Sequence, residues 1–355
     1  MWNAQEFLEK ETSAWQALRT CGKPVVLYGM GDGADKVLAA FDRFGIVPAA
    51  VMASDAFVRG QSFHGFTVKK CGDLERELGD FAVALCFASQ LPEVMDAIKG
   101  VAARHMLLAP PVPVFGDVLF DDAFVAEHSG EMAAAYALLA DDLSRSVYRS
   151  VLRFYYTGDI RLLDAVTTGK DEVFAHLLRL GGNEVYVDLG AYNGDTVDEF
   201  LHYTGGSYRK IVALEPNAGN FAKLRAHCAD MPRVELWQLG AWDRNTVLRF
   251  NNKAGRSSAI APQGVETRVA AVDSILCGTS ATYVKADVEG ADWETLIGMR
   301  ETLRRCKPKL NFAAYHRFED LFRLPLLIRR LNPAYKIYLR HHPYIPAWDT
   351  NIYGV

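Results

Sequence analysis

The sequence lacks several features that mark particular classes of protein. It contains no apolar run of about 18 residues, which a membrane-spanning helix needs, and its first residues show no basic and then apolar signal pattern. The net charge is only −4, from 39 basic and 43 acidic residues, so nothing favours bulk electrostatic binding to nucleic acid. We therefore expect a cytoplasmic protein that binds neither a membrane nor nucleic acid.

Patterns that bind metals are also missing. The six cysteines are scattered without a Cys-x-x-Cys pair, and Cys86 lies in an apolar run, so reduced and buried thiols are expected. No spacing of two or three histidines suits a metal. His341 and His342 are adjacent on an expected strand and would point to opposite faces of the sheet. The sequence therefore predicts no metal site, although Asp287 contributing to one stays an open alternative.

The composition is that of an ordinary globular protein. Of the 355 residues, 50% are hydrophobic and 23% are charged, and this length suggests two or three domains. Residues 1–20 have the spacing of one amphipathic helix. Residues 23–112 then alternate strand and helix signals, which predicts a small doubly wound α/β sheet.

Three prolines in residues 109–115 mark a boundary, because proline interrupts helices and central strands. Helical spacing follows from about residue 131 to residue 180, and strand signals return after Gly181-Gly182. We expect three parts: a Rossmann-like accessory domain, a helical connector and a second α/β domain, over residues 1–112, 113–180 and 181–355.

The segment from Val185 to Thr196 is the most informative part of the chain. It has the pattern of a buried strand that ends near Asp188, a turn containing Gly190 and Gly194, and the start of a helix. The next expected strand ends in Glu215, and a carboxylate at that place can accept hydrogen bonds from both hydroxyls of a ribose. Together these features predict an adenosine-type cofactor across the carboxyl ends of a parallel sheet.

The turn differs from the Gly-x-Gly-x-x-Gly turn that binds a dinucleotide. Its spacing is Asp188-x-Gly190-x-x-x-Gly194, and the carboxylate would repel a pyrophosphate. A ligand with an ammonium or sulfonium group, such as S-adenosylmethionine, suits this turn. An ordinary strand-to-helix turn without a ligand is the alternative.

Four segments of the C-terminal half resemble the FkbM-type S-adenosylmethionine-dependent methyltransferases. They are Val187-Asp-Leu-Gly-Ala-Tyr-Asn-Gly-Asp195, Ala213-Leu-Glu-Pro-Asn217, Lys285-Ala-Asp-Val-Glu-Gly-Ala-Asp292, and His316-x-x-Glu-Asp-Leu321 with Pro325-Leu-Leu-Ile328. The resemblance covers about residues 140–355. It implies a Rossmann-like class I methyltransferase domain that methylates a hydroxyl of a sugar, glycan or natural product. It does not name the acceptor, and a homodimer stays an open alternative.

In such a domain the glycine turn would hold the methionine part of the cofactor, Asp188 would orient its amino group, and Glu215 would hold the ribose. Gly240-Ala241-Trp242 would line the adenine pocket, although Trp242 suits a core position equally well. The expected cofactor-binding residues are Asp188, Gly190, Ala191, Tyr192, Gly194, Glu215, Pro216, Ala241 and Trp242.

The acceptor hydroxyl must lose its proton, so a nearby base is expected. Strand alternation places Lys285, Asp287 and Glu289 on one face, where the three charges need to pair or to act. We expect a functional role for Asp287 and a structural one for Glu289. Lys285 is a further catalytic candidate. His316 follows another strand and, as a neutral imidazole, could take the proton.

Two further expectations concern loops. The polar segment from Asn251 to Ser258 could cover the acceptor, although a plain hairpin turn is favoured.

The segment Gly29-Met-Gly31-Asp-Gly-Ala34 fits a dinucleotide fingerprint, and Asp55 stands where a ribose-binding acid belongs.

The N-terminal part, including Gly60 to Gly65, also resembles the small Rossmann-like domain ahead of some sugar-modifying acyltransferases. Two alternatives to methyl transfer follow: an NAD-dependent oxidoreductase that uses Gly29 and Gly31, and a non-catalytic nucleotide-binding scaffold.

Overall fold

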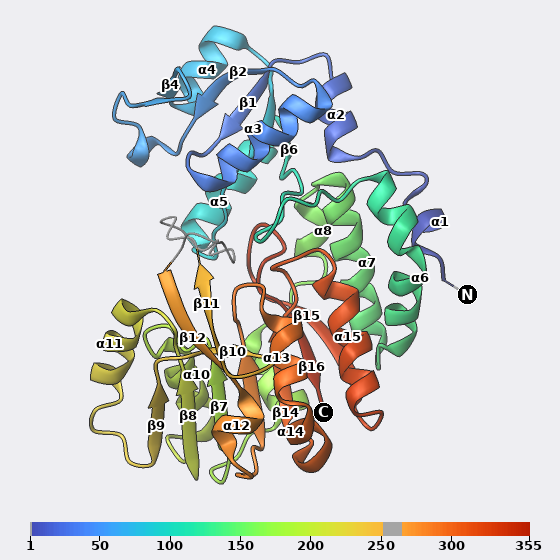
Figure 1. The fold of residues 1–355 in the computed structure, drawn as a ribbon. Helices are drawn as coiled ribbons and strands as arrows, with labels where there is room; N and C mark the ends of the chain where they lie inside the picture. Colours follow the sequence, from blue (N-terminus) through green and yellow to red (C-terminus); the bar gives the residue numbers. More distant parts are fainter. Residues whose placement is uncertain (1, 251–264) are drawn as a thin grey trace.

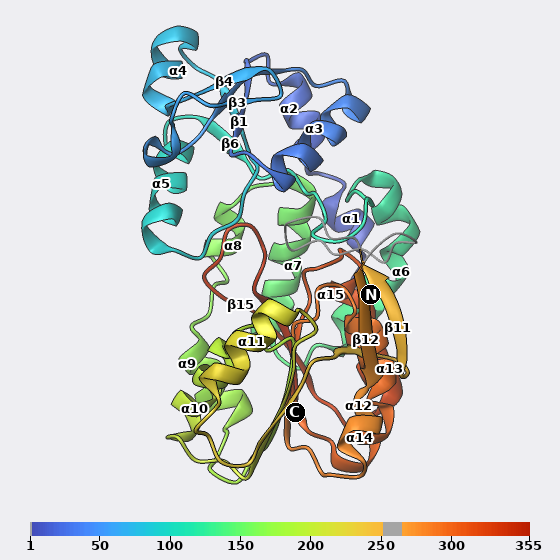
Figure 2. The same ribbon diagram turned by 60° about the vertical axis from the view of Figure 1, so that its left-hand side comes forward.

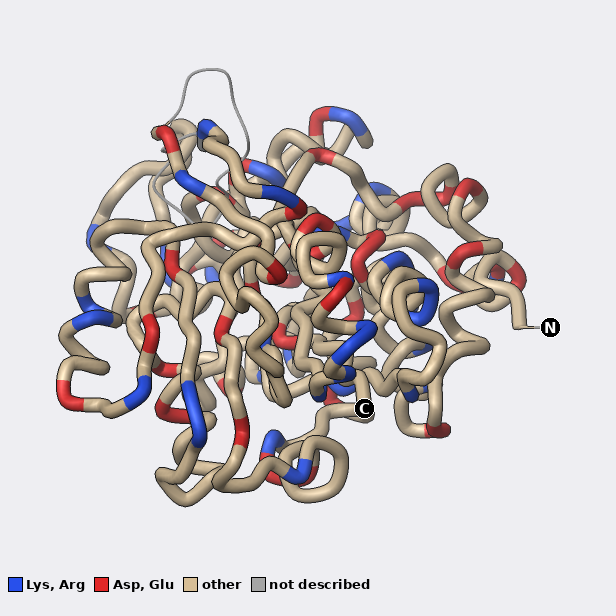
Figure 3. The backbone as a smooth tube through the Cα atoms, turned by 60° about the horizontal axis from the view of Figure 1, so that its bottom comes forward, with Lys and Arg blue, Asp and Glu red and all other residues tan. Residues whose placement is uncertain are grey.

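The structure is a computed structural model that describes residues 2–250 and 265–355. It stacks two α/β units end to end, with the helices α6 and α7 beside them (Figures 1 and 2). We call the six-stranded sheet with its helices the N-terminal unit, and the seven-stranded sheet with its helices the C-terminal unit. Basic and acidic residues are interspersed along the chain in the view of Figure 3. Within the described residues, every helix is too short or too polar to cross a membrane.

The N-terminal unit has the strand order β3-β4-β2-β1-β5-β6, and only β3 runs antiparallel to its neighbour. The central strands β1 and β5 are buried along their whole length, as their apolar sequences predict for parallel strands covered on both faces. The strands are β1 (Val25–Tyr28), β2 (Pro48–Met52), β3 (Ser62–Phe63), β4 (Phe66–Lys69), β5 (Ala82–Leu85) and β6 (Met106–Leu108). The helices are α1 (Ala4–Leu8), α2 (Ala14–Thr20), α3 (Asp32–Phe44), η1 (Asp55–Phe57), α4 (Cys71–Leu78) and α5 (Pro92–Ala102).

The start of the chain differs from the expectation of one helix over residues 1–20. Two helices form instead, and Ser13 caps the second because its side chain accepts a hydrogen bond from the Gln16 amide at 3.2 Å. A serine at this position favours the start of a new helix over the continuation of the previous one.

The connector consists of helices that pack onto the C-terminal unit. Ser144 in α7 accepts a hydrogen bond from the Leu339 amide at 3.0 Å, and Asp141 pairs with Arg340 at 2.6 Å. The helix α6 lies against α15 and begins earlier than expected, capped by Asp121. The connector elements are α6 (Asp122–Leu138), α7 (Asp142–Thr157), α8 (Arg161–Asp164), α9 (Lys170–Val173) and the π-helical turn η2 (Phe174–Leu178).

The C-terminal unit has the strand order β15-β16-β14-β13-β7-β8-β9, in which only β16 runs antiparallel. The strands are β7 (Val185–Leu189), β8 (Lys210–Leu214), β9 (Val234–Trp237), β13 (Tyr283–Ala286), β14 (Lys309–Ala313), β15 (Ile337–His341) and β16 (Thr350–Gly354). The strand order reverses beside β7, and in open parallel sheets ligands bind at the carboxyl ends of the strands at such a point.

Further elements cover this sheet. A smaller sheet joins β10 (Gly240–Trp242), β12 (Val265–Ala271) and β11 (Thr246–Phe250) in that order. The helices are α10 (Asp195–Thr204), α11 (Ala218–His227), α12 (Val272–Leu276), α13 (Asp292–Gly298), α14 (Arg300–Cys306) and α15 (Asp320–Leu331).

The two units meet through segments that follow the carboxyl ends of their strands. Ser89, after β5, and Ile345, after β15, exchange backbone hydrogen bonds of 2.8 and 3.0 Å. Phe115 in the proline-rich segment donates its amide to the His316 carbonyl at 2.9 Å. The carboxyl ends of the two sheets therefore face the same interface.

Candidate active site

The glycine turn after β7 brings two strands into close contact. Gly190 has a φ of +83°, and a Cβ atom there would lie 2.0 Å from the carbonyl oxygen of Asp287. Gly194 has a φ of +100°, and a Cβ atom there would lie 2.6 Å from the His227 ring. Only glycine fits such positions without strain. The turn and the end of β13 are thus held side by side.

Asp188 lies at the base of this turn with none of its surface exposed. Its Oδ2 atom accepts a hydrogen bond from the Thr196 hydroxyl at 2.5 Å, whereas its Oδ1 atom has no hydrogen-bond partner among the described residues. Burial raises the pKa of Asp188, and the charge of Lys285, its register partner on β13, partly opposes that rise. A buried acceptor without a partner is costly, so Oδ1 is suited to a donor that a ligand brings.

Glu215 follows β8 beside the same turn and is 6% exposed. Its two oxygens accept hydrogen bonds from the amides of Tyr192 at 3.0 Å and Asn217 at 2.8 Å. These bonds fix the carboxylate, and each oxygen keeps a second lone pair for a ligand hydroxyl. Burial raises the pKa of Glu215, against the opposing effect of the two amides.

The other expected cofactor residues lie around these two acids. Ala191 is buried and its amide donates to the Leu214 carbonyl at 3.0 Å, while Tyr192 is 48% exposed. Pro216 lies 3.8 Å from a Cβ atom placed on Gly240, so β10 adjoins the Glu215 loop. Ala241 is buried and Trp242 is half-buried. Their contact with adenine stays a prediction.

Asp287 follows β13 and is held by hydrogen-bond donors. The Tyr315 hydroxyl lies 3.3 and 3.2 Å from its two oxygens, and Nε2 of His316 lies 3.1 Å from Oδ1. Burial acts to raise the pKa of Asp287, but the hydrogen bond from His316 and the charge of Lys285 outweigh it and hold that pKa well below its usual range. Asp287 is therefore an ionised carboxylate at neutral pH.

Lys285 is half-buried between acids. Burial acts to lower its pKa, but the charges of Asp287 and Asp188 outweigh burial and raise it. Lys285 therefore stays a cation that balances the two carboxylates. Glu289 is exposed, with a φ of +52°, and its Oε2 atom lies 3.8 Å from Nε2 of His316.

His316 differs from the expected neutral base. It is 1% exposed, and its Nδ1 atom lies 2.9 Å from Oδ2 of Asp292 while Nε2 faces Asp287. Burial acts to lower the pKa of His316, but the neighbouring carboxylates outweigh it and raise that pKa well above the ordinary value. The ring is therefore a cation that donates from both nitrogens. A protonated imidazole cannot take a proton from a substrate, so the neutral-base interpretation is corrected.

Comparison with known proteins decides the family. Residues 188–343, which span this site, match the model of the methyltransferase FkbM domain. These residues therefore form a methyltransferase FkbM domain. A crystal structure of methyltransferase FkbM from Methylobacillus flagellatus KT aligns with 99% of this chain and 92% of its own at 21% identity, with a TM-score of 0.71. This shows that the two proteins share a fold.

Two other solved structures align with the chain more distantly. A precorrin-6y C5,15-methyltransferase from Geobacter metallireducens has 14% identity and a TM-score of 0.33, over 50% of this chain and 82% of its own. A fibrillarin from Aeropyrum pernix, in complex with bound S-adenosyl-L-methionine, has 12% identity and a TM-score of 0.35, over 52% of this chain and 72% of its own. No curated protein matches the chain.

The FkbM domain contains a group of possible metal ligands that the sequence did not reveal. Ligand atoms of Asp292, His316 and Asp320 lie within 4.8 Å of one another. His316 and Asp320 lie four residues apart, but Asp292 begins the separate helix α13, so only the fold brings all three together. Because His316 donates from both nitrogens, it has no lone pair for a metal in this state.

A second such group, Cys71, Glu75 and His105, lies in the N-terminal unit. There the guanidinium of Arg104 lies 2.9 Å from Glu75 and 3.8 Å from Cys71, so a cation already holds these groups.

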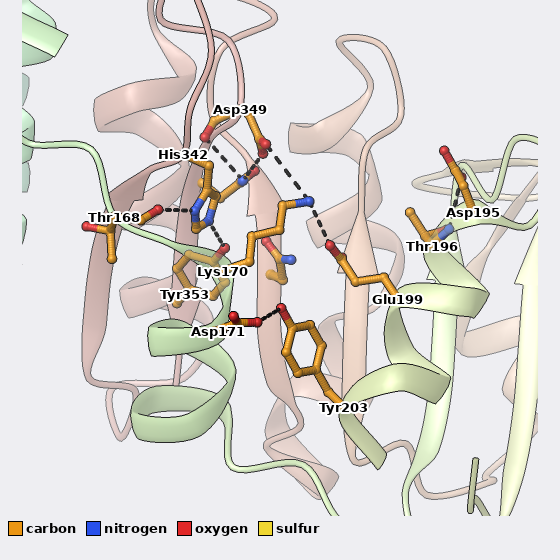
Figure 4. A network of polar contacts seen from close by, with 12 residues as sticks. Thr168, Lys170, Asp171, Asp195, Thr196, Glu199, Tyr203, His342, Asp349 and Tyr353 are labelled. Atoms are coloured by element: carbon orange, nitrogen blue, oxygen red, sulfur yellow. Dashed lines mark hydrogen bonds and ion pairs between the residues drawn. The ribbon is translucent and has the colours of Figure 1, made fainter. Parts of the chain in front are cut away.

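A polar network ties the FkbM domain to the connector (Figure 4). Lys170 in α9 pairs with Glu199 in α10 at 2.7 Å. The two ring nitrogens of His342 bond to the Thr168 carbonyl at 2.8 Å and the Tyr353 hydroxyl at 2.7 Å. Burial lowers the pKa of His342, so its ring is neutral. This network fixes α10, whose first turn holds the Thr196 hydroxyl against Asp188.

The N-terminal fingerprint is packed closely at its first glycine. A Cβ atom on Gly29 would lie 2.7 Å from the Phe87 ring, whereas one on Gly31 would meet no atom within 4 Å, so nucleotide binding at this turn stays a prediction. Asp55 is exposed at the start of η1. The expected acceptor loop from Asn251 to Ser258 lies outside the described residues.

Proposed function

We propose that this FkbM methyltransferase transfers the methyl group of S-adenosylmethionine to a hydroxyl of a small-molecule, glycan or natural-product acceptor. The observation that supports this most is the buried and unpartnered Oδ1 atom of Asp188 beside the glycine turn. Glu215 stands on the neighbouring strand with spare lone pairs. An ammonium group would satisfy the first acid and a ribose the second.

The charges around the turn favour a cationic ligand. Asp188, Glu215 and Asp287 bring three carboxylates toward one place, and the cations of Lys285 and His316 offset only part of their charge. S-adenosylmethionine supplies a methyl group on a positively charged sulfur, which needs no further activation. The protein's task is to hold the reactants in line, a contribution of roughly 7–11 kcal/mol when the geometry is good.

Asp287 is the residue that we propose to receive the acceptor's proton. Its low pKa makes it a weak base, so it would accept a hydrogen bond from the hydroxyl first and take the proton only as the new bond forms. Tyr315 and His316 orient it, and Lys285 keeps the local charge balanced. His316 is thus a positioning residue in this proposal.

Calorimetric titration with S-adenosylhomocysteine tests the cofactor assignment. We expect one site per chain, and a Glu215→Gln variant at least about tenfold weaker, because a lost hydrogen bond to a charged group costs about 1.5–3 kcal/mol. Glu235→Gln is the control, since Glu235 in β9 pairs with Lys210 on the adjacent strand β8 and accepts a hydrogen bond from the Trp237 indole on its own strand. Equal affinity for S-adenosylhomocysteine in the native protein, Glu215→Gln and Glu235→Gln would contradict the assignment.

Turnover separates an enzyme from a scaffold. S-adenosylhomocysteine release from S-adenosylmethionine, measured over a panel of phenols, alcohols and sugars, should appear with at least one acceptor class. Cofactor binding without turnover across the whole panel would favour the non-catalytic scaffold.

A further inference from the structure

A cavity of about 250 Å³ lies between the two units. Its walls come from four parts of the chain: the N-terminal unit, the proline-rich segment, the connector helix α7 and the C-terminal unit. Residues from these parts include Met30 and Phe87, Val112, and Tyr315, Phe318 and Trp348. Neither unit alone encloses this space, so the N-terminal unit supplies part of a binding site.

The cavity adjoins the reacting groups through one side chain. Tyr315 lines the cavity, and its hydroxyl lies 3.2 Å from Oδ2 of Asp287. The carbonyl oxygen of Asp287 in turn packs against Gly190 of the cofactor turn. A molecule in the cavity that reaches past the Tyr315 ring would therefore meet Asp287, the proposed proton acceptor.

The walls are mainly apolar and aromatic. The Tyr315 and Trp348 rings lie nearly parallel, with 18° between planes and 6.4 Å between centroids. Lys36 is a charged residue of the lining, but its ammonium group is already engaged by the carbonyls of Pro113 at 3.2 Å and Val114 at 2.8 Å and by Asp32 at 3.0 Å. A polyhydroxylated sugar would bury hydroxyls here with few partners, at a cost of about 1–3 kcal/mol for each one left unsatisfied.

We infer that this interdomain cavity binds the apolar body of the acceptor and directs its hydroxyl toward Asp287. The inference rests on the proposed methyl transfer and narrows its acceptor to a phenol or an alcohol on an aromatic or aliphatic body. An apolar cavity of about 150 Å³ holds benzene, so this larger one suits a body of about two fused rings. The N-terminal unit then acts as an acceptor-binding domain.

Binding of 2-naphthol tests the cavity directly. Its fluorescence is titrated with the full-length protein, both with and without saturating S-adenosylhomocysteine. The test variant is Val112→Trp, which fills the cavity from its half-buried wall. The control is Val118→Trp, the same change six residues along the chain, at a residue that is 44% exposed and outside the cavity lining. Met30→Trp, in the wall that the N-terminal unit supplies, serves if Val112→Trp does not fold.

We expect the native protein and Val118→Trp to bind 2-naphthol alike and the cavity-filling variant to bind it at least tenfold more weakly. Affinity for S-adenosylhomocysteine should stay equal in all of them. Three results would overturn the inference. They are naphthol binding as tight as the native protein's by a folded cavity-filling variant, no naphthol binding by the native protein, and displacement of naphthol by methyl glucoside. Naphthol is also titrated without S-adenosylhomocysteine, so the two proposals are tested separately. A failure to bind S-adenosylhomocysteine would count against the methyltransferase proposal and not against the cavity.

Discussion

Nε2 of His316 lies 3.1 Å from Oδ1 of Asp287, inside a site where His316 is 1% exposed. This contact joins a buried cation to the carboxylate that we propose as proton acceptor. The second nitrogen of His316 bonds to Asp292, so the ring cannot rotate away without losing a buried hydrogen bond. Asp287 is therefore held both ionised and in one orientation.

Asp287→Asn should lower kcat by about 10²- to 10⁴-fold, the usual contribution of a general base. Affinity for S-adenosylhomocysteine should change little, because Asp287 approaches the cofactor turn through its backbone carbonyl. Release of S-adenosylhomocysteine with an accepted hydroxyl compound measures the effect. Glu289→Gln, two residues along and exposed, should keep most of the activity. An equal loss in both variants would argue against a special role for Asp287.

His316→Gln should shift the acidic limb of the kcat/KM profile to higher pH. His316 lowers the pKa of Asp287, so replacing His316 raises the pKa of Asp287. As pH falls, Asp287 in the variant is therefore protonated at a higher pH than in the native protein. An opposite charge at this range lowers a carboxyl pKa by about 1–3 units, which sets the size of the expected shift. His176→Gln at an exposed position is the control. An unchanged profile would remove His316 from the positioning role.

Asp320→Asn should make thermal stability less dependent on pH. Burial and the charge of Asp292 raise the pKa of Asp320 from 3.8 to about 8. The folded chain keeps this proton up to about pH 8, whereas the unfolded chain releases it above about pH 4, so stability falls as pH rises through this window. Asparagine can still accept the Arg317 amide bond, which is 2.9 Å long.

The measurement is the melting temperature of Asp320→Asn relative to that of the native protein, at pH 5 and at pH 8. This difference should be at least about 2 °C larger at pH 8, since a change of 1 kcal/mol in stability shifts the melting temperature of a domain of this size by roughly 2–4 °C. Asp42→Asn on the exposed face of α3 should show no such trend. A difference that stays constant with pH would mean that Asp320 ionises normally in the fold.

Gly190→Ala should destabilise the protein and weaken cofactor binding more than tenfold. A positive φ alone costs about 1–3 kcal/mol for alanine, and the new Cβ atom would also meet the Asp287 carbonyl at 2.0 Å. Gly22→Ala is matched in backbone conformation, with a φ of +68°, but meets no atom within 4 Å. It should lose some stability and keep its affinity for S-adenosylhomocysteine. Melting curves and calorimetry measure the two effects.

The strands could be predicted because each is marked by a run of neighbouring residues in the sequence. The strands expected to end near Asp188 and at Glu215 are confirmed, as Val185–Leu189 and Lys210–Leu214. Such runs are apolar, short and bounded by glycine or charged residues. The hairpin β3–β4 was missed because its strands are two and four residues long and only Val68 is buried.

The site was predictable only in part. The acids at 188 and 215 could be found because each ends a strand, and the structure places them on neighbouring strands beside one turn. The charge of His316 was not predictable, since its partners Asp287 and Asp292 precede it by more than twenty residues and reach it only through the fold. The interdomain cavity was hidden for the same reason, because its walls join segments that are far apart in the sequence.

A crystal structure with S-adenosylhomocysteine bound tests the central claim most directly. The account predicts the ribose on Glu215, the amino group toward Asp188, and the sulfur facing Asp287. Ligand density at the N-terminal turn of Gly29, or a nucleoside that contacts neither Asp188 nor Glu215, would contradict it.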